Sequence, residues 1–133
     1  MARYLLALAV VMAALVVPSV ANATAAETIR LTTVETSSRA TDAGFTFKEK
    51  LYQGGKLVGR GKGLCVIVTV EVFDCKITLT LPDGKIVLST RIAGANRGTF
   101  KVVSGSGEFQ GATGTGTWRN LPNDKTRVTI RLN

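Results

Sequence analysis

Residues 74–93 read DCKITLTLPDGKIVLSTRIA, and this stretch decides the fold. Apolar and polar residues alternate from Cys75 to Leu81, and Ile86, Leu88 and Ile92, which share one parity, continue an apolar face after the turn. A period of two is typical of half-buried strands, and the intervening Pro82-Asp83-Gly84 favours a tight turn. The stretch therefore predicts a β-hairpin with antiparallel strands at 74–81 and 85–93.

The same alternation continues in both directions from this hairpin. It predicts further strands at 28–36, 44–52, 57–68, 98–104, 111–119 and 126–132, with turns at Gly54-Gly55, Gly105-Ser106-Gly107 and Pro122-Asn123-Asp124. Short connections favour antiparallel pairing between consecutive strands. We therefore expect an all-β fold, an eight-stranded antiparallel up-and-down barrel, because closure removes exposed sheet edges. A two-sheet sandwich is the structural alternative.

The first residues have the pattern of an export signal. Arg3 provides a positive charge, the apolar run from Leu5 to Val17 follows, and Ala21-Asn22-Ala23 offers the small residues that a signal peptidase requires. The run is shorter than the roughly 20 residues of a membrane-spanning helix. We expect a signal peptide at 1–23, one barrel domain at 24–133, and a secreted, extracellular protein with no membrane association after the signal is removed.

The charge and composition exclude several kinds of site. The expected mature chain loses only Arg3 of the 17 lysines and arginines and keeps all 9 acids, so it is basic. The cations are scattered and do not alternate with aromatic residues, so no nucleic-acid partner is expected, although weak attraction to anionic polymers is. The chain has no histidine, which excludes Ser-His and Cys-His catalysis and, with two cysteines, a zinc site.

The strand predicted at 57–68 carries a row of glycines. Gly59, Gly61, Gly63 and Cys65 share one face, and Cys75 has the same parity on the next strand. Two cysteines in an exported chain form a disulfide by default, so we expect a Cys65–Cys75 bond between directly paired positions. That register places the glycines opposite large side chains. The row either leaves room inside the barrel or relieves crowding at a bend.

Two glycine-rich segments resemble a known family. Residues 58–64, VGRGKGL, resemble the Val-Gly-Arg-Ala-Gln-Gly segment of plant dirigent proteins. Residues 102–114, VVSGSGEFQGATG, resemble the dirigent Val-Val-Gly-Gly-Thr-Gly-x-Phe-x-x-Ala-x-Gly segment. Allene oxide cyclases share the same barrel. The two cysteines and Leu81-Pro82-Asp83-Gly84 make the chain most similar to short bacterial allene oxide cyclase barrel-like proteins.

The resemblance implies a barrel that assembles as a dimer or trimer and uses no metal or organic cofactor. Dirigent proteins steer the coupling of phenoxy radicals, and allene oxide cyclases close a strained epoxide. We therefore expect a cavity that binds or steers a small apolar or aromatic molecule, with cyclase- or isomerase-like activity left open. The alternative is a non-catalytic carrier, or a secreted structural protein whose barrel is filled.

Glu49 is the candidate catalytic residue. The dirigent pattern places an acid two residues before a leucine, here Leu51, and alternation places Glu49 on the inner face. Burial raises the pKa of a carboxyl group and suits it to acid–base work, whereas a solvated or ion-paired glutamate is the structural alternative. Tyr52 is a second candidate proton donor. The residues expected to line the ligand cavity are Phe45, Phe47, Gly61, Gly63, Leu79, Leu88, Phe100 and Trp118.

The outer face of the glycine-rich strand has an apolar segment. Leu64, Val66 and Val68 share the parity of Arg60 and Lys62, so they should lie on the outer wall. Monomers usually cover apolar patches of this kind. We therefore expect the protein to form a homo-oligomer through this face.

Overall fold

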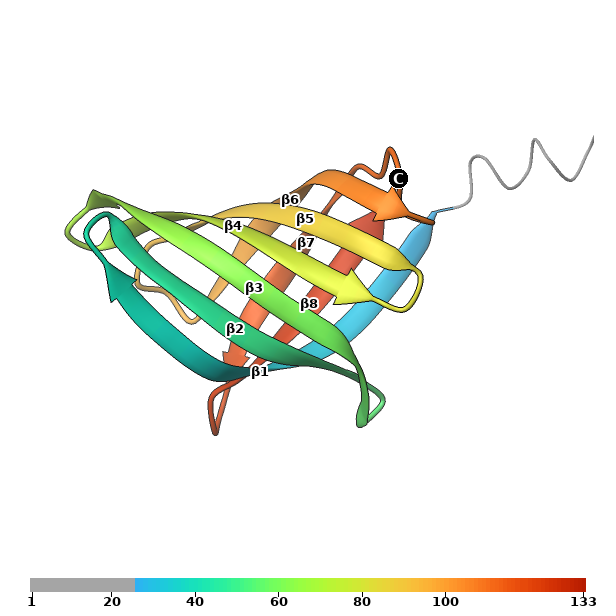
Figure 1. The fold of residues 1–133 in the computed structure, drawn as a ribbon, viewed down its shortest axis with the longest axis horizontal. Coiled ribbons are helices and arrows are strands. Elements are labelled where there is room, and N and C mark those ends of the chain that lie inside the picture. Colours follow the sequence, from blue (N-terminus) through green and yellow to red (C-terminus); the bar gives the residue numbers. More distant parts are fainter. Residues whose placement is uncertain (1–25) are drawn as a thin grey trace, which may run out of the picture.

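The computed structural model describes residues 26–133, so the predicted signal peptide at 1–23 lies outside the described residues. The strands are β1 (Glu27–Thr41), β2 (Gly44–Gln53), β3 (Lys56–Thr69), β4 (Val72–Leu81), β5 (Gly84–Ile92), β6 (Arg97–Gly107), β7 (Gly114–Leu121) and β8 (Lys125–Leu132). Each strand pairs antiparallel with the next, and β1 pairs with β8 to close the barrel (Figure 1). This confirms the predicted barrel and excludes the sandwich.

The register of the glycine-rich strand is also confirmed. Cys65 on β3 pairs directly with Cys75 on β4, and the two form a disulfide. In the same register Gly61 pairs with Leu79, and Gly63 pairs with Ile77. Successive side chains alternate between the faces of a sheet, so this one pairing fixes which residues of β3 and β4 point inward.

The ends of β1 and β6 differ most from the prediction, together with the start of β7, which lies at Gly114 and not at 111. β1 continues to Thr41, with a register shift between Glu35 and Ser37, because a bulge bends the strand without ending its pairing with β2. β6 continues through residues 105–107, which we predicted as a turn, because these residues still pair with the start of β5. The turn instead follows Gly107, whose φ of 64° suits glycine, and the connection occupies 108–113.

The hydrophobic core closes one end of the barrel. Leu51, Ile86 and Ile130 are completely buried there, near the connections after β2, β4 and β6. Phe109, from the connection between β6 and β7, is also buried and joins this cluster. The turns after β1 and β3 lie side by side at the opposite end (Figure 1), where the Ile67 amide donates a hydrogen bond to the Ala43 carbonyl. Because the hydrophobic core fills one end of the barrel, a ligand site would lie in the other half.

No helix among residues 26–133 has the length and apolar character needed to cross a membrane.

Removing the disulfide should lower the stability of the barrel. The bond closes a loop of 10 residues, so the chain-entropy model gives about 2–3 kcal/mol of stabilisation. We expect the double variant Cys65→Ala/Cys75→Ala to lose that much in free energy of unfolding, measured by urea denaturation. Wild-type protein unfolded under reducing conditions should lose a similar amount. An unchanged denaturation midpoint in both experiments would contradict the prediction.

Candidate functional site

A cavity of about 510 Å³ occupies the half of the barrel that the core leaves open. Its walls come from every strand except β3, and its outer part reaches Ala95, between β5 and β6, and Asn123 and Asp124, between β7 and β8. The predicted lining residues Phe45, Phe47, Leu79, Leu88, Phe100 and Trp118 all border it. A volume of this size is typical of small-molecule sites, and the interior is therefore not filled by side chains.

The glycines of β3 make room for the side chains of β2 that line the cavity. A Cβ atom added to Gly63 would overlap the ring of Phe47, and one added to Gly61 would lie 2.6 Å from the Glu49 carboxyl oxygen. Phe47 pairs with Gly63 across the sheet, and Glu49 pairs with Gly61. The two glycines face inward as predicted, but Phe47 and Glu49 cover them, so they contribute room and not lining surface.

Aromatic side chains form the wall on the side of β2. The Phe45 ring lies 6.2 Å from the Phe47 ring and meets the Phe73 ring edge-on at 5.2 Å, between ring centroids. Phe45 also pairs with Cys65, so the disulfide lies beside this aromatic row. Rings held in this way present a rigid apolar surface to a ligand.

Glu49 is the titratable group in this wall. It points into the cavity and is partly buried, and it pairs across the sheet with Glu35, which also borders the cavity. Burial raises the pKa of Glu49 from 4.5 to about 7, the charge of Glu35 adds to the rise, and a hydrogen bond with Thr33 opposes it. A carboxyl group with this pKa can donate or accept a proton at neutral pH.

Thr33 and Glu35 are site residues that our sequence analysis did not single out. The available signal was the alternation of Ile29, Leu31, Thr33 and Glu35, which puts a hydroxyl and a carboxylate on an otherwise apolar inner face. Two polar residues that end an apolar stripe mark the point where a strand passes from core to cavity.

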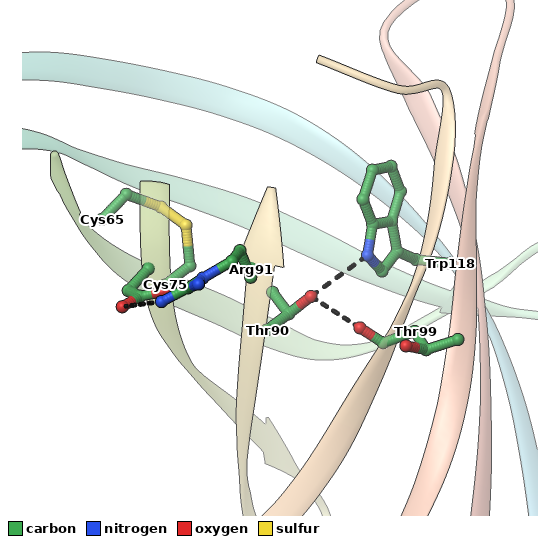
Figure 2. The surroundings of a disulfide bond; sticks show 7 residues. Cys65, Cys75, Thr90, Arg91, Thr99 and Trp118 are labelled. Carbon is green, nitrogen blue, oxygen red and sulfur yellow. Dashed lines mark hydrogen bonds and ion pairs between the residues drawn. A yellow bond between two sulfur atoms is a disulfide. The ribbon is translucent and has the colours of Figure 1, made fainter. Parts of the chain in front are cut away.

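Trp118 is fixed on the opposite wall by a short chain of hydrogen bonds (Figure 2). Its indole Nε1 donates to Thr90 Oγ1 at 3.3 Å, and the same hydroxyl donates to the Thr99 carbonyl at 2.7 Å. Thr90 is buried and pairs with Cys75, so Figure 2 shows the disulfide and the indole on either side of it. The indole nitrogen is thereby occupied, and Trp118 offers the cavity its apolar ring.

Tyr52, the second candidate proton donor, does not border the cavity. It follows the register shift between Leu51 and Tyr52 in the pairing of β2 with β3, so the alternation of inward and outward side chains is interrupted there. The ionisable groups at the cavity are therefore Glu35 and Glu49 on β1 and β2, with Asp124 and Lys125 at the outer part. In the part of the chain that the structure describes, no three cysteine or carboxylate side chains gather as a metal site would require.

The fold is shared with several solved structures. A pyocyanin demethylase matches with a TM-score of 0.70 at 21% identity, covering 80% of this chain and 100% of that one. A pterocarpan synthase dirigent protein matches at 0.63 and 14% identity, over 81% and 86%. A nonspecific heme-binding cyclase that catalyses a cycloaddition in neoabyssomicin biosynthesis matches at 0.67 and 17% identity, over 90% and 72%.

These likenesses establish a common fold with barrels of the cyclase and dirigent type, as the two glycine-rich segments predicted. No protein-family model matches the sequence, and no curated protein matches it either.

The raised pKa of Glu49 predicts a specific effect of pH on stability. The folded protein holds the proton more tightly than the unfolded chain, so stability should fall as pH rises from about 4.5 to about 7 and then level off. The shift corresponds to at most about 3 kcal/mol. Glu49→Gln should therefore raise the free energy of unfolding at pH 8 and leave it nearly unchanged at pH 4.

Thermal or urea unfolding at the two pH values measures this difference. Glu35→Gln is the matched control, because it should lower the pKa of Glu49 by removing a neighbouring charge. An effect of Glu49→Gln that is the same at both pH values would show that Glu49 is not a protonated, buried carboxyl group.

Proposed function

We propose that this chain is an exported barrel protein that binds a small apolar or aromatic molecule in the cavity and changes it with the help of Glu49. The observation that carries the proposal is the open cavity of about 510 Å³ with aromatic walls and one carboxyl group of pKa about 7. Structures of the same fold include proteins named as a demethylase, a dirigent protein and a cyclase, which supports a small-molecule ligand. The disulfide is compatible with export.

The lining of the cavity limits the charge of the ligand. Glu35 and Glu49 lie side by side on β1 and β2, with Glu35 the more exposed, and the cation that borders the cavity, Lys125, lies beside the turn after β7. An anionic group on the ligand would be repelled by the charge of Glu35 and, whenever Glu49 is ionised, by a second carboxylate beside it. The ligand that fits is therefore neutral or cationic, with flat apolar rings for Phe47 and Trp118.

The reaction class that fits Glu49 is an isomerisation or ring closure. As a carboxylate, Glu49 accepts a proton from one atom of the ligand, and as the acid it returns the proton to another, so the group is regenerated. Enclosing walls exclude water from the charged intermediate. A carrier that binds the same ligand without changing it is the second candidate. Such a carrier would bind the ligand in the cavity and show no turnover of it.

Ligand binding can be tested with two dyes that differ in charge. N-phenylnaphthylamine is neutral, and anilinonaphthalene sulfonate has nearly the same rings with a negative charge. Trp118 is the chain's only tryptophan and borders the cavity, so energy transfer from it to a bound dye reports occupation. We expect saturable transfer to the neutral dye and roughly tenfold weaker binding of the anionic dye, because of like-charge repulsion.

The Glu49→Gln variant supplies the control for this experiment. It should keep its affinity for the neutral dye and bind the anionic dye more tightly than the wild type, because one carboxylate is gone. Absence of energy transfer to either dye would remove the ligand-binding proposal altogether.

Self-association is a further prediction, because Leu64, Val66 and Val68 are 50%, 43% and 47% exposed on the outer wall of β3. Covering these side chains would remove apolar surface from water. We expect light scattering to give a dimer or trimer for the wild type and a monomer for Val66→Lys/Val68→Lys. A wild type that remains monomeric at high concentration would contradict this.

A further inference from the structure

A second hollow lies on the outside of the barrel, across β1, β2, β3 and β4, and we call it the outer groove. It encloses about 710 Å³ and is separate from the cavity, with which it shares Phe47 alone. Four cations line it: Arg39 from β1, Lys48 from β2, Lys62 from β3 and Lys76 from β4. The four strands are consecutive neighbours in the sheet (Figure 1). The four cations therefore form one band across it.

The cations of the outer groove are held close together without compensating acids. Lys48 pairs directly with Lys62, so the two like charges start from strands about 5 Å apart, and Lys76 lies on β4 two positions from the residue that pairs with Lys62. Like charges at directly paired positions destabilise a sheet. No carboxylate lines the outer groove, and the salt bridge found among residues 26–133, Asp74 with Arg91, lies outside it. The arrangement favours an anion supplied by another molecule.

The placement of the acids shows that this band is not a random result of a basic composition. Glu35 and Glu49 face the interior, and five others, Asp42, Glu71, Asp83, Glu108 and Asp124, lie in turns. Glu27 begins β1, and Asp74, the remaining acid, is bound to Arg91 at 2.8 Å. The outer wall is therefore cationic with almost no internal neutralisation, and it can attract polyanions over a distance.

The other groups of the outer groove indicate which polyanion fits. Hydroxyl groups of Ser37, Thr46 and Thr78 lie among the cations and can exchange hydrogen bonds with sugar hydroxyls. Single-stranded nucleic acids require aromatic side chains for stacking. The aromatic residue at the outer groove, Phe47, turns its ring inward over Gly63 and offers none.

We propose that the outer groove binds a linear anionic polysaccharide, with the four cations on its sulfate or carboxylate groups and the hydroxyls on its sugar oxygens. The assignment does not depend on the function of the cavity. It would hold the protein on an extracellular polymer while the cavity remains accessible, because the two lie on opposite faces of the same strands. Of the residues expected to mediate self-association, Leu64 lines the outer groove whereas Val66 and Val68 do not, so a contact made through Val66 and Val68 leaves the outer groove accessible.

The test compares short dextran sulfate with neutral dextran of the same length, by calorimetry with the purified protein. Lys48→Ser/Lys62→Ser removes two cations from the outer groove, and Lys85→Ser/Lys101→Ser removes two exposed lysines from β5 and β6. Both variants have the same net charge. We expect the first to weaken dextran sulfate binding roughly tenfold and to reduce the salt dependence of log K by about two, one for each lysine removed. The Lys85→Ser/Lys101→Ser variant should change the affinity for dextran sulfate and its salt dependence only slightly.

Equal losses in the two variants would mean that net charge alone attracts the polymer, and the site would be withdrawn. Two further probes distinguish the polymer class: a single-stranded oligonucleotide and vesicles containing anionic lipid. Tighter binding of either probe than of dextran sulfate, lost in Lys48→Ser/Lys62→Ser, would overturn the polysaccharide assignment. Unfolding of that variant provides the check on structure, and we expect a stability equal to or above that of the wild type, because a like-charge pair is removed.

Discussion

The contact between the side chains of β2 and the glycines of β3 is the constraint on which the site depends. Glu49 and Phe47 fit against Gly61 and Gly63, where any side chain would overlap them. Small eight-stranded barrels are normally just wide enough for their own side chains to fill them. Two large residues that lie against a bare wall leave the centre open, and this single arrangement provides the space, the aromatic surface and the position of the carboxyl group.

The same contact determines the chemistry of Glu49. A carboxyl group held against the wall is removed from most of the water, and it lies opposite Glu35, so its charged form is disfavoured and its pKa rises to about 7. The Thr33 hydroxyl limits this rise, which keeps the group near the pH at which proton transfer in both directions is possible. A carboxyl group whose charged form is disfavoured in this way is common at functional sites.

Much of this could be predicted from the sequence because a strand has a period of two. The cysteine pair gave the register of β3 with β4, and alternation from there put Glu49, Phe45 and Phe47 on the inner face. The bulge after Glu35 could not be predicted, since it depends on how β1 bends between β8 and β2. The cavity volume could not be predicted either, because a row of glycines is at least as typical of a crowded bend as of an open interior.

The fixed register also explains how one sheet carries two opposite kinds of surface. Along β2, Phe47 and Glu49 face the interior while Lys48 faces the outer groove, so neighbouring residues serve different faces. A slip of one residue between β2 and β3 would bring the lysines inside and the carboxylate outside, and both faces would be lost together. The Cys65–Cys75 bond fixes β3 against β4, and Gly61 and Gly63 leave the room that Glu49 and Phe47 occupy in the observed register. The barrel therefore needs these two devices on adjacent strand pairs, one covalent and one steric, to keep an acidic interior separate from a basic exterior.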